Sequence, residues 1–304
     1  MHILGVDATV LGIDDLADGQ RFYRDFGLEE VESGQSGSSF LTLDGSEIIL
    51  RSGSDAGLPP AVVNGPTIRE IVWGVPDDQA LDQLGAEVQK DRPVYFGNDR
   101  VLRTIDNDGY ALAFRVTRRR PFESGINTLN IFGGEENRAL NSRVDFSCPV
   151  RPATIGHVVL FTPDVSSAIS FYVDRLGFRV SDVFKGGRGA FLRAAGSSDH
   201  HTLFLVKSPD VQRGLHHVSF HVTDFHEVMI GGKQLSDRGW KTKFGPGRHV
   251  IGSNCFWYFQ SPCGGAMELA CDMDHADDNW RVREWDFRPE NVAGWSMTFN
   301  QRPA

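Results

Sequence analysis

The sequence predicts an α+β protein made of four strand–helix–strands units that pair into two halves. The chain has 304 residues, which suits about two domains of roughly 100–200 residues each. Its first and second halves contain similar segments. Its apolar runs are short, rich in β-branched or aromatic residues, and bounded by Gly, Ser, Asp or Pro, as strands are. Length, internal repetition and strand-like runs together indicate this fold class.

The longer pair of similar segments is "ATVLGIDDLADGQRFYRDFGL" (8–28) and "HVVLFTPDVSSAISFYVDRLGF" (157–178). Each begins as an apolar strand that ends at an Asp, continues as a helix bearing Phe-Tyr, and closes on a turn that contains Gly. The same seven-residue spacing separates the Asp from the Phe in both copies. This repetition predicts one supersecondary unit used more than once.

A shorter pair is "EIVWGVPD" (70–77) and "HVSFHVTD" (217–224). Both end at an Asp that precedes a helical stretch. The side chain of such an Asp can accept a backbone N–H of the first helical turn, so we expect it to be the helix N-cap. The repeats divide the chain into four units at about 5–52, 65–117, 153–207 and 213–272.

These units predict an N-terminal domain (1–120) and a C-terminal domain (153–272). The stretch between them, 121–152, breaks the pattern and is rich in turn residues, so we interpret it as a linker. The tail, 273–304, contains three tryptophans. We expect it to pack on the body, because a disordered tail would be poor in aromatic residues.

Composition narrows the class of partner. A formal net charge of -9 makes the chain a poor partner for nucleic acid or an anionic membrane. There is no apolar run of 18 or more residues and no signal peptide at the N-terminus. The four cysteines, Cys148, Cys255, Cys263 and Cys271, show no CxxC spacing. We therefore expect a cytoplasmic protein with buried, reduced thiols.

Three segments carry a resemblance to a known family: "IGHVVLFTPDVSSAISFYVDRLGF", "LHHVSFHVTD" and "FWYFQSPCGGAMELACD". They resemble the vicinal oxygen chelate superfamily, which includes glyoxalases, bleomycin resistance proteins and dioxygenases, and more closely its type I extradiol ring-cleaving dioxygenases. The resemblance covers nearly the whole chain. It implies four βαβββ modules paired into two domains, with mixed sheets that form cup-like half barrels. In that family only the C-terminal cup holds a metal ion.

His157, His217 and Glu268 are the candidate metal ligands. On an alternating strand His217 shares its face with Leu215 and Ser219, a mostly apolar side that should be interior. Glu268 lies in "GAMELAC", where a carboxylate would be costly to bury without a partner. Two imidazoles and one carboxylate on a single cation leave open coordination positions, as in non-haem Fe(II) oxygenases. A lone His or Glu of this kind is usually structural, but three at matching repeat positions favour a metal site.

The repeat also distinguishes neighbouring residues. His157 and His217 each precede an Asp by seven residues, so His216 is expected on the opposite face, as a structural or surface residue. His221, on the face of His217, could support the site or line the cup. The positions of the N-terminal half that match the three ligands are Ala8, Glu70 and approximately Leu112. That set cannot hold a divalent ion, so we expect a metal-free N-terminal scaffold.

The resemblance also implies three catalytic residues. His201, which precedes the strand "TLFLV", matches the acid–base histidine of the family, and His200 does not. Tyr258 matches the tyrosine that hydrogen-bonds a substrate oxygen, and His249 matches a residue of the substrate pocket. The alternatives are an exposed loop histidine, a packed core tyrosine and a turn-capping histidine, respectively.

One departure from the family pattern follows His249. Some members have Asn and Asp shortly after this histidine, whereas this chain has "VIGSN". Ile251 and Gly252 are apolar, so the local hydrogen-bond network is altered and the pocket could favour a different ring substituent. Asn254 could compensate.

The expected activity is therefore an Fe(II)-dependent extradiol dioxygenase. It would cleave a catechol-type ring next to its vicinal hydroxyls and incorporate O2, in the catabolism of aromatic compounds. No organic cofactor is needed, and Mn(II) could replace iron, because nitrogen and oxygen ligands do not separate the two ions sharply. The family commonly assembles into homo-oligomers.

Two alternatives stay open. One is another metal-dependent member of the superfamily, either a hydroquinone-cleaving dioxygenase or a glyoxalase-like lyase or isomerase. Such an enzyme need not have His201, His249 and Tyr258 together. The other is a non-enzymatic protein that sequesters drugs in the cup. Those proteins usually lack the metal triad.

Overall fold

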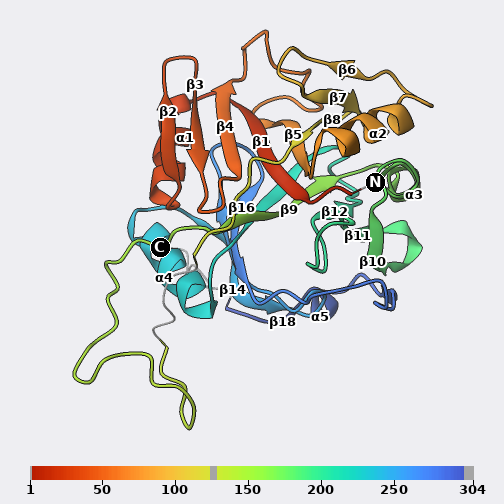
Figure 1. Ribbon diagram of the computed structural model, residues 1–304. Coiled ribbons are helices and arrows are strands. Elements are labelled where there is room, and N and C mark those ends of the chain that lie inside the picture. Colours follow the sequence, from red (N-terminus) through yellow and green to blue (C-terminus); the bar gives the residue numbers. More distant parts are fainter. Residues whose placement is uncertain (1, 124–128, 298–304) are drawn as a thin grey trace.

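The computed structural model describes residues 2–123 and 129–297, which form two mixed β-sheets accompanied by short helices (Figure 1). The first sheet consists of β1 (Gly5–Ile13), β2 (Glu29–Ser33), β3 (Gly37–Leu41), β4 (Glu47–Ser52), β5 (Thr67–Val75), β6 (Tyr95–Phe96), β7 (Leu102–Ile105) and β8 (Ala111–Val116). The second consists of β9 (Thr154–Phe161), β10 (Arg179–Phe184), β11 (Gly189–Arg193), β12 (Leu203–Val206), β13 (Gly214–His221), β14 (Thr242–His249), β15 (Cys255–Gln260), β16 (Ala266–Cys271), β17 (Arg283–Trp285) and β18 (Ala293–Ser296).

The two sheets have the same strand order. It is β2-β3-β4-β1-β5-β8-β7-β6 in the first sheet and β10-β11-β12-β9-β13-β16-β15-β14 in the second, with β17 and β18 added at the edges. Within a unit the first and last strands pair in parallel, and the two units of a half meet through an antiparallel pair, β1 with β5 or β9 with β13. The predicted α+β fold of four βαβββ modules in open, mixed sheets is confirmed.

Four helices begin where the repeats predict. They are α1 (Leu16–Asp25), α2 (Asp78–Val88), α3 (Val165–Ser170), which continues as a π-helical turn to Arg175, and α4 (Phe225–Asp237). The carboxylates of Asp15, Asp77, Asp164 and Asp224 each accept the backbone N–H three residues later. The expected aspartate N-caps are confirmed, and a cap of this kind is typically worth about 1 kcal/mol.

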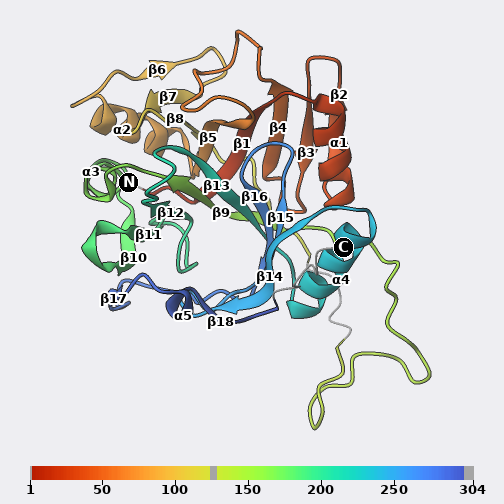
Figure 2. The same ribbon diagram turned by 180° about the vertical axis from the view of Figure 1, so that it is seen from behind.

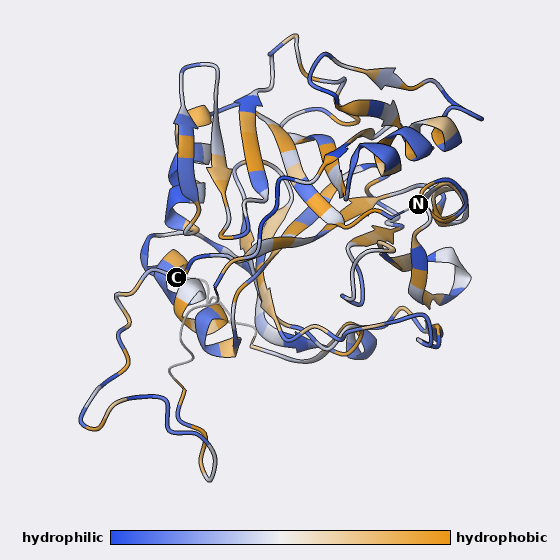
Figure 3. Ribbon diagram, in the orientation of Figure 1, coloured by the Kyte–Doolittle hydropathy of each residue, from blue (hydrophilic) through white to orange (hydrophobic). Residues whose placement is uncertain are grey.

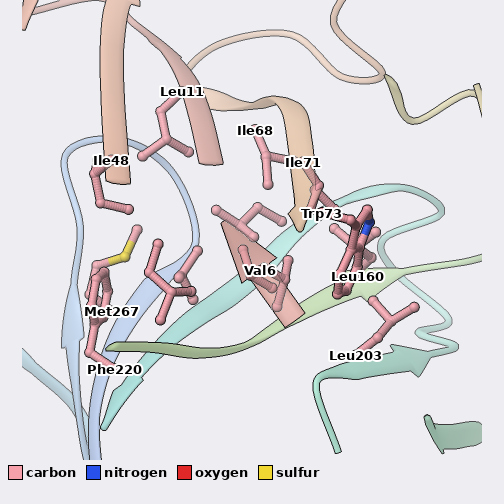
Figure 4. Packing of buried hydrophobic residues seen from close by; sticks show 14 of the residues in the cluster. Val6, Leu11, Ile48, Ile68, Ile71, Trp73, Leu160, Leu203, Phe220 and Met267 are labelled. Atoms are coloured by element: carbon pink, nitrogen blue, oxygen red, sulfur yellow. The ribbon is translucent and has the colours of Figure 1, made fainter. Parts of the chain in front are cut away.

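The main hydrophobic core lies between the two sheets and is shared by both halves. Val6, Leu11 and Trp73 from the first half pack in one cluster with Phe220 and Met267 from the second (Figure 4). The strands at the centre of the molecule are accordingly coloured mainly as hydrophobic in Figure 3. One face of each sheet packs in this shared core. The opposite face of each sheet is therefore available for a site.

The described part of the C-terminal tail belongs to the second sheet. β17 pairs with β10, β18 pairs with β14, and α5 (Pro289–Val292) lies between them. Figures 1 and 2 both show this segment running beneath β11 and β12, across the open side of the second sheet. The remainder of the tail, 298–304, lies outside the described residues, as does 124–128 of the linker.

The cysteines correct one expectation. All four are free thiols, and Cys255, Cys263 and Cys271 are buried as predicted. Cys148 is exposed, so the prediction of burial was wrong there, because this residue lies between the sheets in sequence and outside their common core. Among the described residues, no helix is long and apolar enough to cross a membrane.

Candidate metal centre and cavity

Three adjacent strands bring His157, His217 and Glu268 together. β13 lies between β9 and β16, and Ser219 of β13 is paired both with His157 and with Glu268. His157 Nε2 lies 3.1 Å from His217 Nε2 and 3.2 Å from Glu268 Oε2, and His217 Nε2 lies 3.4 Å from the same oxygen. The strand register therefore converts three positions distant in sequence into one compact donor set.

The donor set is buried and electrostatically coupled. The side chain of Glu268 is fully buried, and those of the two histidines nearly so. Burial lowers the pKa of His157, and it lowers that of His217 to about 4, so both imidazoles are neutral near pH 7. Burial alone would raise the pKa of Glu268, but the adjacent imidazoles of His157 and His217 hold it well below its usual range. Neutral imidazoles and an ionised carboxylate are the protonation states in which these groups bind a metal.

The geometry fits a divalent cation. The three ligand atoms all lie within 4.8 Å of one another, and within the described part of the chain no hydrogen bond of good geometry satisfies the buried Glu268 Oε2. Ligand–metal distances of about 2.1 Å at roughly right angles give ligand–ligand separations of about 3 Å, close to those measured here. A cation equidistant from the three atoms would offset the cost of burying this carboxylate.

His216 does not lie where the repeat places it. A β-bulge makes His216 an extra residue of β13 between Leu215, which pairs with Leu160, and His217, which pairs with Val159. The bulge breaks the alternation, so Leu215 faces the shared core instead of the face of His217. His216 lines the cavity, and its Nδ1 lies 2.6 Å from Nδ1 of His217. His216 therefore contacts the candidate ligand His217 from beside it. The prediction that His216 lies on the opposite face of the strand was wrong.

His221 lies away from the cavity. Its imidazole covers Gly156, where an added Cβ would come within 2.3 Å of Nε2. Its Nδ1 lies 4.0 Å from Asp199 Oδ2. The side chain thus occupies space that a side chain at position 156 would fill, and it does not line the cup near the donor set.

The three predicted catalytic residues surround the donor set. The ring of His201 lies 4.3 Å from that of His157, and the ring of Tyr258 lies 5.0 Å from that of His217. Tyr258 Oη lies 2.9 Å from Nε2 of His249, whose Nδ1 lies 2.8 Å from the carbonyl oxygen of Val292. A carbonyl only accepts, so Nδ1–H of His249 is the donor to Val292, and in an uncharged ring Nε2 then accepts the O–H of Tyr258.

These groups form the floor of a cavity of about 350 Å³ with apolar walls. The walls are Phe184, Phe191, Phe204, Val206, Phe244, Ile251, Phe287 and Val292. Phe191 and Phe204 are stacked in parallel at 4.0 Å between ring centroids. A flat, mostly apolar ligand with a polar end directed at the donor set fits this distribution.

Sequence reasoning missed part of this surrounding. Asn254, noted only as a residue that could compensate, donates through Nδ2 to Glu268 Oε1 at 3.2 Å and is buried. Phe287 and Val292 reach the cavity from the tail; the aromatic residues of the tail predicted that it packs on the body, but not that it lines the cavity. The bulge that turns His216 toward the cavity has no local signal in the sequence, whereas the stretch "VIGSN" did identify Asn254.

The N-terminal sheet shows what the same register holds without a donor set. Glu70 occupies the position of His217, and Ala8 that of His157. Val72, equivalent to Ser219, pairs with Ala113, so the counterpart of Glu268 is Ala113 and the expected Leu112 was off by one residue. Ala8 and Ala113 are fully buried in a small apolar cluster.

In the N-terminal half, Glu70 and Arg103 occupy the positions equivalent to His217 and Tyr258. Arg103 pairs with Ala113 as Tyr258 pairs with Glu268, so Arg103 occupies the position of Tyr258. Its Nε lies 3.3 Å from Glu70 Oε1. The N-terminal cup therefore contains an ion pair and two alanines where the C-terminal cup contains four potential ligands or catalytic groups.

Comparison with known proteins agrees with this division. Residues 154–269 match the family described as the Glyoxalase/Bleomycin resistance protein/Dioxygenase superfamily. The chain is 40% identical to metapyrocatechase 2 of Cupriavidus necator over 215 residues, which is 70% of this chain and 65% of that protein. It is 29% identical to an iron-dependent extradiol dioxygenase of Rhodococcus jostii, over 52% of this chain and 57% of that protein. The chain thus spans about two thirds or less of these two relatives.

Two further similarities extend over more of the chain. A manganese-dependent 2,3-dihydroxybiphenyl 1,2-dioxygenase of Geobacillus genomosp. 3 is 26% identical over 87% of this chain and 84% of its own length. A Mn(II)-bound glyoxalase of Novosphingobium aromaticivorans has the same fold, with a TM-score of 0.75 and 23% identity over 97% of this chain and 91% of that one. The C-terminal half of the chain, residues 154–269, thus matches the glyoxalase/bleomycin resistance protein/dioxygenase superfamily, and the chain as a whole has the fold of that Mn(II)-bound glyoxalase.

Proposed function

We propose that this protein is an extradiol dioxygenase that uses Fe(II) to cleave a catechol-type ring next to its vicinal hydroxyls. The observation that carries the proposal is the buried set of His157, His217 and Glu268 at the floor of an apolar cavity, with His201 and Tyr258 beside it. The relatives named metapyrocatechase 2 and iron-dependent extradiol dioxygenase support the same activity.

The metal, held by His157, His217 and Glu268, would act as the Lewis acid that brings the diol and O2 together. His201 lines the cavity next to His157, and no hydrogen bond from the described part of the chain occupies its Nε2. It can therefore take a proton from a substrate hydroxyl and later return it. Tyr258, which donates to His249, keeps its oxygen lone pairs for a second hydroxyl group.

The substrate we propose is a small, flat catechol. The diol would lie toward the donor set, and the remainder of the ring would lie among Phe191, Phe204 and Ile251. Burial lowers the pKa of His201 well below its ordinary value, with His157 and His200 adding to the effect, so that its ring is neutral in the resting protein. A neutral base beside the diol suits a reaction in which the diol must lose protons.

Iron is the metal we favour, with Mn(II) as the alternative. The three ligand types do not separate these ions sharply, and the relatives include one named as iron-dependent and one named as manganese-dependent. A glyoxalase-like activity is the second candidate function, since a Mn(II)-bound glyoxalase has this fold. The presence of His201, His249 and Tyr258 together favours ring cleavage over that candidate and over sequestration of a drug.

The test is anaerobic loading with Fe(II), addition of catechol, 3-methylcatechol or 2,3-dihydroxybiphenyl, and then admission of air. The proposal predicts a yellow ring-cleavage product and uptake of one O2 for each ring. The same preparation is given hydroquinone and a hemithioacetal. Turnover of either one without turnover of the catechols would favour the alternative enzymes. Full iron content without turnover of any compound would contradict the proposal.

We also propose that the protein is a cytoplasmic homo-oligomer. Ile131, Phe132, Leu140 and Phe146 of the linker are large apolar residues exposed to solvent, and the segment extends away from the body in Figures 1 and 2. Clustered exposed apolar side chains commonly mark interaction sites. Light scattering should give a multiple of the 33.7 kDa chain mass, and the mass of one chain would contradict this part of the proposal.

A further inference from the structure

Behind His201 lies a buried chain of polar groups for which the proposed reaction has no role so far. Nδ1 of His201 lies 3.1 Å from Nδ1 of His200. Nε2 of His200 lies 3.5 Å from Oδ2 of Asp182, on β10, which pairs with β11 and with β17. His200 is fully buried and Asp182 almost so. The order from the cavity outward is therefore His201, His200 and Asp182.

The carboxylate of Asp182 is fixed by the C-terminal tail. The backbone N–H of Arg283 donates to Oδ1 at 2.8 Å, and the indole N–H of Trp285 donates to Oδ2 at 2.9 Å. The ring of Trp280 packs edge-on against that of His200, at 5.2 Å between centroids. Two donors and one aromatic ring from the same segment thus hold both members of the chain behind His201.

These contacts determine where the ring protons lie. His200 Nε2 makes no hydrogen bond of good geometry among the described residues, but a bare lone pair 3.5 Å from an ionised carboxylate would be repelled, so we expect the proton on this nitrogen, on the side of Asp182. Neutral His200 then has a bare Nδ1, which accepts from Nδ1–H of His201. That leaves the lone pair of His201 on Nε2, the nitrogen with no hydrogen-bond partner among the described residues.

We propose that Asp182 and His200 are positioning residues that hold the ring of His201 in one orientation and in the Nδ1–H tautomer, with Nε2 directed at the substrate. The proposal deepens the proposed function, because it explains why this histidine can serve as a base at that nitrogen. It also gives the tail a role: residues 280–285 support the catalytic histidine through Asp182. Which nitrogen of a histidine is protonated is commonly set by the partner of the other nitrogen.

The tautomer can be measured without turnover. The full-length, metal-free chain labelled with ¹⁵N-histidine is examined by long-range ¹H–¹⁵N correlation, with assignment by His200 and His201 variants. The proposal predicts a protonated Nδ1 and a bare Nε2 in His201. His200→Phe, which keeps a flat ring but removes both nitrogens, should abolish this preference. His200→Gln, whose amide can donate to Asp182 and accept from His201, should retain it.

Kinetics of the iron-loaded enzyme give the second readout. We expect His200→Phe to lower kcat on the order of 10- to 100-fold, the range usual for outer partners of a site, with iron content and KM little changed. His200→Gln should restore most of the rate. Asp199→Asn is the matched control, because Asp199 faces His221 and His275 instead of His200, and it should leave kcat unchanged.

The outcomes separate the two proposals. A wild-type His201 protonated at Nε2, or a tautomer that His200→Phe leaves unchanged, would overturn the positioning role whatever the enzyme catalyses. An iron-loaded wild-type protein that turns over no catechol would overturn the proposed function, while the labelling experiment would still decide the tautomer. If His200→Phe fails to fold, His200→Gln combined with Asp182→Asn tests the same chain. A conserved tautomer and unchanged kcat in that double variant would count against the proposal.

Discussion

The two halves of this molecule have the same strand order and the same register, yet among the described residues only the C-terminal half has a set of candidate metal ligands. In the C-terminal sheet the equivalent positions carry His157, His217 and Glu268, whereas in the N-terminal sheet they carry Ala8, Glu70 and Ala113. The fold therefore supplies three converging positions twice. What differs is the chemistry of three side chains, so the βαβββ scaffold alone does not make the site.

A second difference concerns how each cup is covered. The C-terminal sheet is extended by β17 and β18, and the segment that contains them contributes Phe287 and Val292 to the cavity wall. Within residues 2–123 and 129–297, the strand order of the N-terminal sheet has no such additions. Its concave face instead holds the ion pair between Glu70 and Arg103. Among the described residues, only the C-terminal cup thus combines a candidate donor set with a tail segment that lines its cavity.

The largest expected effect comes from removing a candidate ligand of the C-terminal half, and the equivalent change in the N-terminal half is its control. His217→Ala should abolish iron binding and reduce ring cleavage by more than the roughly 10- to 100-fold that outer-partner changes cause. Glu70→Gln, at the equivalent position, should leave the iron content unchanged. Metal analysis after gel filtration measures both. Equal iron loss in the two variants would break the comparison between the halves.

The stability contributed by the contact between the two halves should depend on pH. Asp106, from the N-terminal half, accepts a hydrogen bond from Tyr172 of the C-terminal half, and burial raises its pKa from 3.8 to about 6. Because the folded pKa is raised, this group stabilises the fold below about pH 4 and loses that contribution as pH rises through about 6. The full change is about 3 kcal/mol.

Asp106→Asn removes this titration. The variant should lose up to about 3 kcal/mol of the pH dependence of unfolding between pH 4 and pH 7, measured by urea denaturation at several pH values. Asp145→Asn, in the exposed linker, is the control and should leave the profile nearly parallel to that of the wild type. If Asp106→Asn leaves the wild-type profile unchanged, the carboxyl group of Asp106 does not titrate in this range.

A smaller effect is expected from the hydroxyl that only the C-terminal cup has. Tyr258→Phe removes the hydrogen bond to His249 but keeps the ring beside His217. Loss of a hydrogen bond worth about 1 kcal/mol should lower kcat roughly 5- to 10-fold without loss of iron. Steady-state oxygen uptake at saturating catechol measures it. An unchanged kcat would remove Tyr258 from the proposed catalytic set.

The smallest effect concerns the tail. Trp285→Phe keeps an aromatic ring but removes the indole N–H that donates to Asp182. The free energy of unfolding should fall by about 1 kcal/mol. Trp295→Phe is a suitable control, because Trp295 is substantially exposed. Equal stability losses in the two variants would show that the tail contributes through packing alone.

Much of this architecture could be predicted because the signals are local or repeated. The aspartates that end strands gave the helix N-caps, and the repeat gave the strand positions of His157 and His217. The bulge at His216 could not be predicted, because one extra residue in a strand has no recognisable pattern in the sequence. The same bulge made the predicted face of Leu215 wrong, since Leu215 faces the shared core. The counterpart of Glu268 in the first half was missed by one residue for a similar reason, since only the pairing of β5 with β8 identifies Ala113.

Contacts between segments distant in the sequence could not be predicted either. Asp182 and His200 come together through the pairing of edge strands with the tail, and Phe287 reaches the cavity from beyond the last predicted unit. Such contacts depend on tertiary packing, not on periodicity or turn residues. The domain boundaries at 120 and 153 stay a prediction, since the two sheets share one hydrophobic core.

The most direct test is anomalous diffraction at the iron edge from crystals of protein loaded with Fe(II) without oxygen. The account predicts one peak per chain, within bonding distance of His157 Nε2, His217 Nε2 and a carboxylate oxygen of Glu268, and none beside Ala8, Glu70 and Ala113. A fully loaded crystal with its iron elsewhere, or with no peak between these three side chains, would contradict it.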